Sequence, residues 1–299
     1  MINFNSANIV DIVDDLEEKS GRISCQFSNT TDPLKYFGFN CNPFQDSVNP
    51  EFFFRTESHE DAYIKMKDSI ENDISLGLTT AVAGTGKTLL TQILLSELPQ
   101  EKYKSILILA YPQMSRTALL KEIVKEIGAG ETTEKGNVHD YLEIIQDEII
   151  SLYKKHIKLI VIIDEVHFLD AKTLHILRTL SNIEIPEKKL ITVLLFGEDI
   201  FLKRMANPSY KSIFSRMFVR AQLRPLLVNE VEQYIKFRCL VAGGNAAIFS
   251  QDCYETIYKY SKGIPRDINR IAYNAMVFAA ESGIKTISAQ FLKEIINKK

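Results

Sequence analysis

The chain has 299 residues, of which 45% are hydrophobic and 25% charged, and its 36 basic and 38 acidic residues give a net charge of −2. This composition is typical of a soluble globular protein and excludes a long disordered, collagen-like or disulfide-stapled chain. The balanced charge also excludes a strongly basic nucleic-acid-binding surface over the whole chain, although local patches can still bind phosphate.

Neither the cysteines nor the apolar runs point to secretion or to a membrane. The four cysteines form no CxxC pair, as expected for reduced thiols in the cytoplasm. The longest apolar runs, 159–163 and 193–196, are far shorter than the roughly 18 residues of a membrane span. The acidic N-terminal stretch is unlike a signal peptide. We therefore expect a cytoplasmic protein without a transmembrane segment.

Residues 1–31 are predicted to form an N-terminal extension with a short amphipathic helix. Ile9, Ile12, Val13 and Leu16 follow the spacing of one helix face, and acidic residues lie opposite them. Polar and turn-forming residues follow this stretch. The sequence leaves two interpretations open: the helix packs on the protein's own body, or it docks on a partner.

From Tyr36 to Leu223 the pattern alternates between strands and helices, which predicts an α/β fold with a parallel sheet between helices. Ser58, with Asp61 three residues later, is expected to begin the first helix. The strand 159–163 is apolar throughout, which indicates burial on both faces of the sheet. The expected strands are 76–82, 105–109, 159–163 and 190–196, and the later helices are 87–98, 115–127, 138–155 and 171–182.

After Leu223 the pattern is helical only. The expected helices are 229–242, 250–261, 265–282 and 288–297. A small all-helical domain after an α/β domain is the simplest division, with the boundary near Arg224-Pro225. We therefore predict an extension over 1–31, an α/β core over 32–224 and a helical domain over 225–299.

The segment 81–88 matches the phosphate-binding pattern GxxxxGK[ST], except that Ala81 replaces the first glycine. It lies between an apolar strand and a helix, where backbone N–H groups can bind phosphate oxygens. Lys87 is expected to reach the β- and γ-phosphates of ATP, and Thr88 to coordinate Mg²⁺. The residues expected to contact the nucleotide are Ala83, Gly84, Thr85, Gly86, Lys87, Thr88 and Leu89.

A second motif supports this site. The apolar strand 159–163 ends in Asp164 and Glu165, at the sheet edge where the phosphate loop also lies. Asp164 is expected to hold Mg²⁺, and Glu165 to orient and polarise the attacking water. We interpret His167 as a surface residue or a neighbour of the site, and no histidine spacing predicts a structural metal.

With these motifs, the chain resembles the ExeA/GspA-type AAA+ ATPases from about Tyr36 to its C-terminus. The resemblance rests on segments in one order and at family-like spacing: 36–39, 42–44, 84–90, 164–169, 189–197 and 261–269. It implies a P-loop AAA+ core, a helical lid domain, and ATP held at subunit interfaces of a homo-oligomer.

The resemblance also implies roles for two arginines. Arg216 matches the arginine finger, which reaches a neighbouring subunit's site and neutralises transition-state charge; Arg220 is the alternative. Arg266 matches the second sensor of the lid, which contacts the γ-phosphate. One position departs from the family, because Glu198 stands where glutamine is usual. An ionised carboxylate facing phosphate would repel it unless paired or protonated, so hydrolysis is expected to be slow or Glu198 to point away.

Three functional readings remain open. The favoured one is an ATPase that drives or regulates a protein partner at the cell envelope, such as a bacterial secretion or pilus machine, docked peripherally at the inner membrane. The alternative is a transposition-type regulator on duplex DNA, with the basic runs 154–158, 188–189 and 203–204 as contacts. The third is a nucleotide switch with slow turnover, which Glu198 supports.

Overall fold

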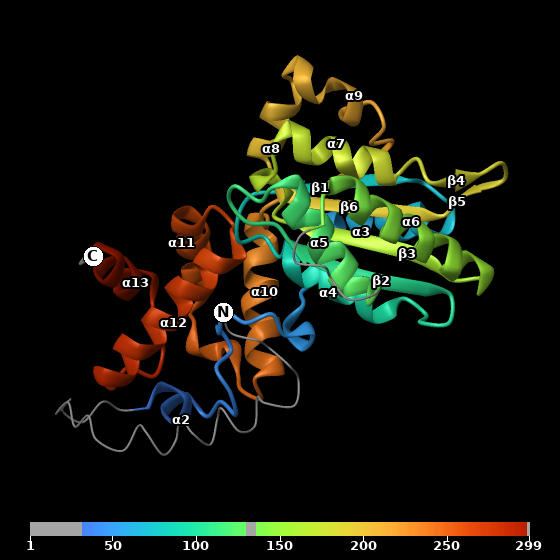
Figure 1. Ribbon diagram of the computed structural model, residues 1–299. Coiled ribbons are helices and arrows are strands. Elements are labelled where there is room, and N and C mark those ends of the chain that lie inside the picture. Colours follow the sequence, from blue (N-terminus) through green and yellow to red (C-terminus); the bar gives the residue numbers. More distant parts are fainter. Residues whose placement is uncertain (1–31, 130–135, 298–299) are drawn as a thin grey trace, which may run out of the picture.

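The computed structural model describes residues 32–129 and 136–297 (Figure 1). The helix predicted within 1–31 lies outside these residues. The described part of the chain forms two lobes, one around a parallel sheet and one made of helices (Figure 1).

The sheet lobe is built on five parallel strands in the order β2-β3-β6-β1-β7. Their bounds are β1 Leu76–Ala81, β2 Tyr103–Leu109, β3 Lys158–Asp164, β6 Ile191–Glu198 and β7 Val219–Leu223. The predicted fold class is confirmed, and β7 adds an edge strand to the four expected ones. The register pairs Ala81 with Glu198 and Leu109 with Asp164. The carboxyl ends of β1 and β3, from which the two sequence motifs begin, therefore lie at the same edge of the sheet.

Helices cover both faces of the sheet. Along β3, Leu159, Val161 and Ile163 belong to one hydrophobic cluster, and Ile160 and Ile162 belong to another. Helices α5, α6 and α7 pack on the first side, and α3 and α4 on the second. Their bounds are α3 Glu57–Glu71, α4 Lys87–Glu97, α5 Arg116–Ile127, α6 Val138–Lys154 and α7 Ala171–Leu180. This two-sided burial is the reason that β3 is apolar throughout.

The predicted start of α3 is wrong by two residues. The N-cap is Thr56, whose extended backbone lets its hydroxyl accept a hydrogen bond from the N–H of His59, whereas Ser58 already lies inside the helix. The expected beginning of the helix 115–127 is confirmed, since Ser115 caps α5. After α7 come a short antiparallel hairpin and two short helices, which were not predicted: β4 Glu184–Ile185, β5 Lys188–Lys189, α8 Ile200–Met205 and α9 Lys211–Phe214.

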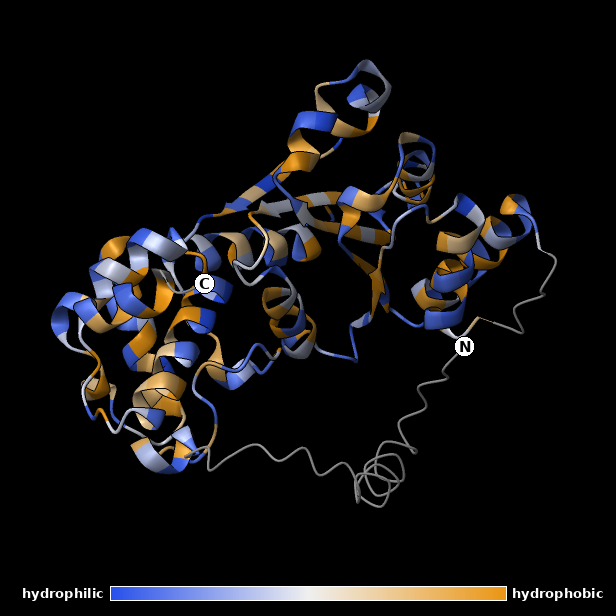
Figure 2. Cartoon of the chain, turned by 90° about the vertical axis from the view of Figure 1, so that its left-hand side faces the viewer, coloured by the Kyte–Doolittle hydropathy of each residue, from blue (hydrophilic) through white to orange (hydrophobic). Residues whose placement is uncertain are grey.

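The helical lobe has a hydrophobic cluster of its own. It contains α10 Val228–Val241, α11 Gln251–Ser261, α12 Pro265–Glu281 and α13 Ala289–Asn297. Figure 2 shows hydrophobic and hydrophilic residues alternating around these helices, as expected when one side of each faces a core. No helix in residues 32–129 or 136–297 combines the length and the hydropathy that a membrane crossing requires.

The first described residues pack with this helical cluster, although they precede the sheet in the sequence. Phe39, Phe44 and Phe52 are buried in it. They belong to a segment that contains α2 Pro33–Phe37 and the short turn η1 Pro50–Phe52. The division at residue 224 stays a prediction, but the side chains of this segment contact the helices expected only after that boundary.

Candidate nucleotide-binding site

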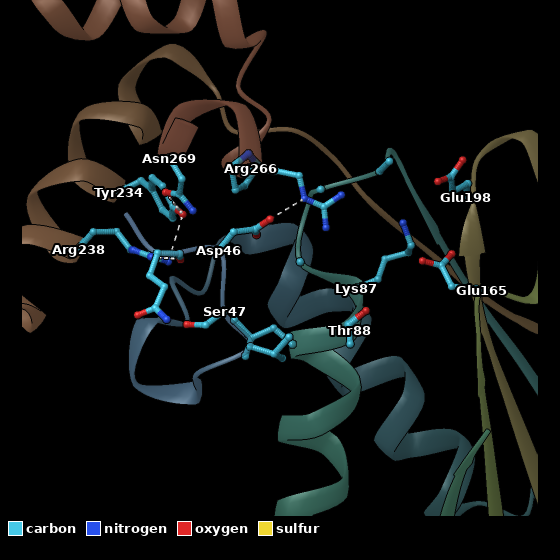
Figure 3. Close-up of a pocket in the computed structure, with 17 residues that line it drawn as sticks. Asp46, Ser47, Lys87, Thr88, Glu165, Glu198, Tyr234, Arg238, Arg266 and Asn269 are labelled. Carbon is cyan, nitrogen blue, oxygen red and sulfur yellow. Dashed lines mark hydrogen bonds and ion pairs between the residues drawn. The ribbon is translucent and has the colours of Figure 1, made fainter. Parts of the chain in front are cut away.

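A pocket opens at the sheet edge where the strands end, between the two lobes (Figure 3). Four parts of the chain line it: the phosphate loop with the start of α4, the ends of β3 and β6, the segment 45–48, and residues of α10 and α12. Six of the seven predicted nucleotide contacts line this pocket: Ala83, Gly84, Gly86, Lys87, Thr88 and Leu89. The sequence motifs and the pocket therefore coincide.

Thr85 is the exception among the predicted contacts. Its side chain is buried, and its hydroxyl donates a 2.8 Å hydrogen bond to the carbonyl of Val82, which stabilises the turn of the loop. Lys87 is 6% exposed, and its Nζ lies 3.5 Å from the carbonyl oxygens of Ala81 and Val82. Gly86 has φ +103° and directly precedes α4, so the loop takes a backbone conformation that favours glycine.

The loop and the end of β3 are joined by one hydrogen bond. The Thr88 hydroxyl donates to Asp164 Oδ2 at 2.7 Å, and Asp164 Oδ1 accepts from the backbone N–H of Glu165 at 2.8 Å. Asp164 is almost completely buried. Hydroxyl and carboxylate oxygens are ligands that Mg²⁺ prefers, so the residues present fit the ion that the sequence predicts.

Glu165 occupies an uncommon backbone position, with φ +56°, and its carboxylate faces the pocket (Figure 3). Burial raises its pKa above the ordinary range, and the negative charge of Asp164 raises it further. Its Oε2 is buried, has no hydrogen-bond partner among the described residues, and lies 3.2 Å from His167 Nδ1. A carboxylate that lines the pocket beside the phosphate loop is suited to accept a proton from water.

His167 and Glu198 lie next to this carboxylate. The backbone N–H of Glu198 is 3.4 Å from His167 Nδ1, and the Glu198 side chain lines the pocket. Glu165, His167 and Glu198 each offer a ligand atom within 4.8 Å of the others, so they could also hold a metal ion. The expectation of His167 as a neighbour of the site agrees with this geometry.

Arg266 approaches the loop from the helical lobe. The backbone N–H of Arg266 donates to the Gly84 carbonyl at 3.3 Å. A Cβ on Gly84 would stand 2.8 Å from Arg266 Cβ. Its Nε lies 3.3 Å from Asp46 Oδ2, and the guanidinium extends toward the side where Lys87 lies (Figure 3). Arg266 is therefore placed to meet the phosphates of a bound nucleotide.

The segment 45–48 and its support were missed from the sequence. Arg238, buried in α10, donates to the carbonyls of Pro43 at 2.5 Å and Gln45 at 2.8 Å. Nearby, Tyr234 donates to Asn269 Oδ1 at 2.9 Å. The available signal was an arginine on the helix face that otherwise buries apolar residues. A charge in such a position requires partners, which here are backbone carbonyls.

Arg216 does not join this group. It is half-buried just beyond α9, donates to Asn182 Oδ1 after α7, and is not among the residues lining the pocket. The alternative, Arg220, lies with its guanidinium 3.7 Å from the centre of the Phe214 ring and donates to the Met217 carbonyl at 2.9 Å. Neither arginine lines the pocket, and each is held by partners within its own chain: Arg216 by one side-chain amide, and Arg220 by the Phe214 ring and two backbone carbonyls.

Comparison with known proteins agrees with this geometry. Residues 72–205 match a family model described as an AAA domain. Over 249 residues the chain is 30% identical to General secretion pathway protein A of Aeromonas hydrophila. The match covers 83% of this chain and 45% of that protein, so the chain spans less than half the length of this relative.

Two solved structures show the fold. Cdc6p of Pyrobaculum aerophilum has a TM-score of 0.66 at 15% identity, with 86% of this chain and 70% of that chain covered. The ORC2 protein of Aeropyrum pernix, in ADPNP–ADP complexes, has a TM-score of 0.63 at 18% identity, with 86% and 71% covered. The sheet, the phosphate loop and the helical lobe thus form a P-loop AAA+ architecture.

Proposed function

We propose that this chain, an AAA+ protein related to General secretion pathway protein A, binds ATP with Mg²⁺ and hydrolyses it. The observation that carries the proposal is the hydrogen bond from Thr88 to Asp164, with the Glu165 carboxylate lining the pocket beside it. This hydrogen bond joins the phosphate-loop motif to the carboxylate motif at the end of β3, although the two residues are 76 positions apart.

Each group has a defined task in this proposal. Lys87 and the loop N–H groups bind the phosphates, and Thr88 and Asp164 hold Mg²⁺, which supplies positive charge to the phosphate oxygens. Glu165 orients the attacking water and accepts its proton. Because burial raises the pKa of Glu165, its carboxylate is a stronger base than an exposed one. Arg266 neutralises charge on the terminal phosphate from the side of the helical lobe.

Arg216 completes the proposal only in an assembly. It is half-buried, partly accessible to solvent, and does not line its own pocket, as is required of a group that reaches a neighbouring copy. A repeated head-to-tail contact would place it at the next subunit's phosphates. We therefore propose a homo-oligomer with ATP at its interfaces.

We propose a protein partner at the cell envelope, supported by the relationship to General secretion pathway protein A. The basic runs considered for duplex DNA are partly engaged inside the protein. Lys158 Nζ donates to Asp73 Oδ1 at 2.8 Å and to the Ile70 carbonyl at 2.7 Å. Arg204 Nη2 donates to the Leu169 carbonyl at 2.8 Å. These two side chains are therefore not available for a phosphate backbone.

The test is ATP turnover by the purified chain at near-physiological salt, with and without duplex DNA. Salt must be fixed because low ionic strength exaggerates attraction to phosphate. Turnover that Lys87→Ala abolishes and DNA leaves unchanged supports the proposal, whereas Lys104→Ala, on an exposed position of β2, is the matched control. Strong stimulation by DNA would replace the protein partner with the DNA reading. Tight ATP binding without turnover would replace hydrolysis with the switch reading.

A further inference from the structure

A buried histidine supports the phosphate loop from beneath. His59 lies in the first turn of α3 and is 3% exposed. Its Nε2 is 3.0 Å from the carbonyl oxygen of Thr85, and its Nδ1 is 2.7 Å from the hydroxyl of Thr56. The ring of Phe53 packs edge-on against the imidazole, with centroids 5.3 Å apart. His59 does not line the pocket, so it can act on a ligand only through the loop.

The partners of this ring determine where its proton lies. A carbonyl oxygen can only accept, so Nε2 must carry the proton that the Thr85 carbonyl receives. Burial lowers the pKa of His59, which keeps the ring neutral. In a neutral ring with Nε2–H, Nδ1 is an acceptor, and the Thr56 hydroxyl therefore donates to it.

Two further hydrogen bonds with the same donor-to-acceptor order connect Thr56 to the junction between the lobes. Because the Thr56 hydroxyl donates its proton to the hydrogen bond with His59 Nδ1, its oxygen can accept from the Ser58 hydroxyl, 3.1 Å away. The Ser58 oxygen in turn accepts from the backbone N–H of Arg224 at 3.4 Å. The hydrogen bonds form one chain in which each group donates to the next, from Arg224 to Thr85.

The Thr85 carbonyl controls a donor of the phosphate loop. In a planar trans peptide, the C=O of one residue and the N–H of the next point in opposite directions. Because His59 holds the Thr85 carbonyl away from the pocket, the N–H of Gly86 is turned toward it. Gly86 lines the pocket at φ +103°, and because it has no Cβ this peptide can rotate more freely than with any other residue here. Without a partner for the carbonyl, that freedom would let the N–H turn away.

We propose that His59 is a positioning residue for nucleotide binding, which fixes the Thr85–Gly86 peptide so that the Gly86 N–H donates to a phosphate oxygen. The inference rests on the proposed function, since it requires nucleotide phosphates in this pocket. It also makes the orientation of this donor depend on the Arg224 backbone, at the junction between the sheet lobe and the helical lobe.

Three substitutions separate this role from simple packing. In His59→Gln the amide nitrogen can reach as far as Nε2, so the donor to Thr85 is restored. In His59→Asn the shorter amide reaches only toward Thr56, and in His59→Phe the ring is kept without any donor. ATP and ADP affinities are measured by calorimetry and steady-state KM and kcat by turnover, with His139→Asn at an exposed position as the control.

Loss of one hydrogen bond to a charged phosphate is expected to raise Kd and KM for ATP about tenfold or more in the Asn and Phe variants. The value of kcat at saturating ATP is expected to change little, because the lost contact binds substrate and transition state alike. His59→Gln is expected to restore most of the affinity. Wild-type affinity in the Asn and Phe variants would overturn the inference.

Outcomes that concern the proposed function are distinguishable. If the wild-type chain binds no ATP or ADP, the proposed function fails and this inference fails with it. If the wild-type chain binds ATP but the variants do not fold, ¹⁵N-histidine NMR of the wild type decides. A hydrogen-bonded Nε2–H supports the inference, and a neutral ring in the Nδ1–H tautomer overturns it.

Discussion

The carbonyl oxygen of Leu226 lies 2.0 Å from the point where a Cβ on Gly263 would stand. Gly263 has φ +75°, and its own carbonyl accepts a 2.8 Å hydrogen bond from the Leu226 N–H. The segment that leaves the sheet lobe after β7 thus lies directly against the turn that precedes α12. Only glycine satisfies both the backbone conformation and this close approach.

Gly263→Ala is therefore expected to lower the free energy of unfolding by at least about 2 kcal/mol, through the left-handed conformation and the clash together. The matched control is Gly283→Ala, since Gly283 has φ +67° and open space around its Cα. Only the conformational cost of about 1 kcal/mol applies there. Urea unfolding of both variants measures the difference. Equal losses of unfolding free energy in the two variants would show that the segment at Leu226 shifts to make room for the new Cβ.

The stability of the protein is expected to depend on pH through His59. Its folded pKa is lowered by burial and by Arg224, while the Thr85 carbonyl and Glu230 oppose this. The unfolded chain takes up a proton near the ordinary histidine pKa of about 6.5, before the folded chain does. The contribution of His59 is thus complete above that pH and is lost as pH falls through its folded pKa.

Unfolding curves between pH 7.5 and 5 measure this effect. The part of the slope due to His59, at most about 1.4 kcal/mol per pH unit, is expected to disappear in His59→Gln and to persist in the exposed-site control His139→Gln. An unchanged slope in His59→Gln would mean that the ring is charged in the folded protein.

Glu165→Gln is expected to bind ATP with nearly wild-type affinity but to lose turnover by about 100-fold or more, because the amide cannot accept the proton of water. Equilibrium binding and steady-state turnover are measured on the same preparation. Glu126→Gln, at an exposed position of α5, is the control for an equivalent loss of charge. Undiminished turnover would remove Glu165 from the role of base.

Arg216 is expected to act on a neighbouring copy. Arg216→Ala keeps its own phosphate loop, and Lys87→Ala keeps its arginine, so each variant alone is expected to be inactive. In an equal mixture, about a quarter of head-to-tail interfaces combine an intact loop with an intact arginine. Turnover of the mixture is expected to approach that fraction of the wild-type rate. No recovery at any ratio would contradict action across an interface.

Most of the fold and the central residues of the site could be predicted from local sequence patterns. The apolar run 159–163 predicted a strand buried on both faces, and its two terminal carboxylates predicted what the end of β3 presents to the loop. The helix after the phosphate loop followed from the same reasoning. These features depend on neighbours in sequence, so the sequence displays them directly.

The parts that were missed depend on distant contacts. Arg238 lies 195 positions from Pro43, and His59 lies 26 from Thr85. No spacing rule relates such pairs, because the fold alone brings them together. The edge strand β7 was also missed, since only its alternate residues are buried and its run is five residues long.

The position of residues 33–54 has a consequence for motion. Phe53 packs with the sheet lobe and Phe54 with the helical lobe, and Leu223 and Leu226 are divided in the same way. The chain therefore crosses between the lobes twice, and the Ser58–Arg224 hydrogen bond lies beside both crossings. Because both crossings are adjacent, a rotation of one lobe against the other would take place about the line that joins them. Along such an arc, Asp46 and Arg266 would travel together, so one movement would open or close both sides of the pocket.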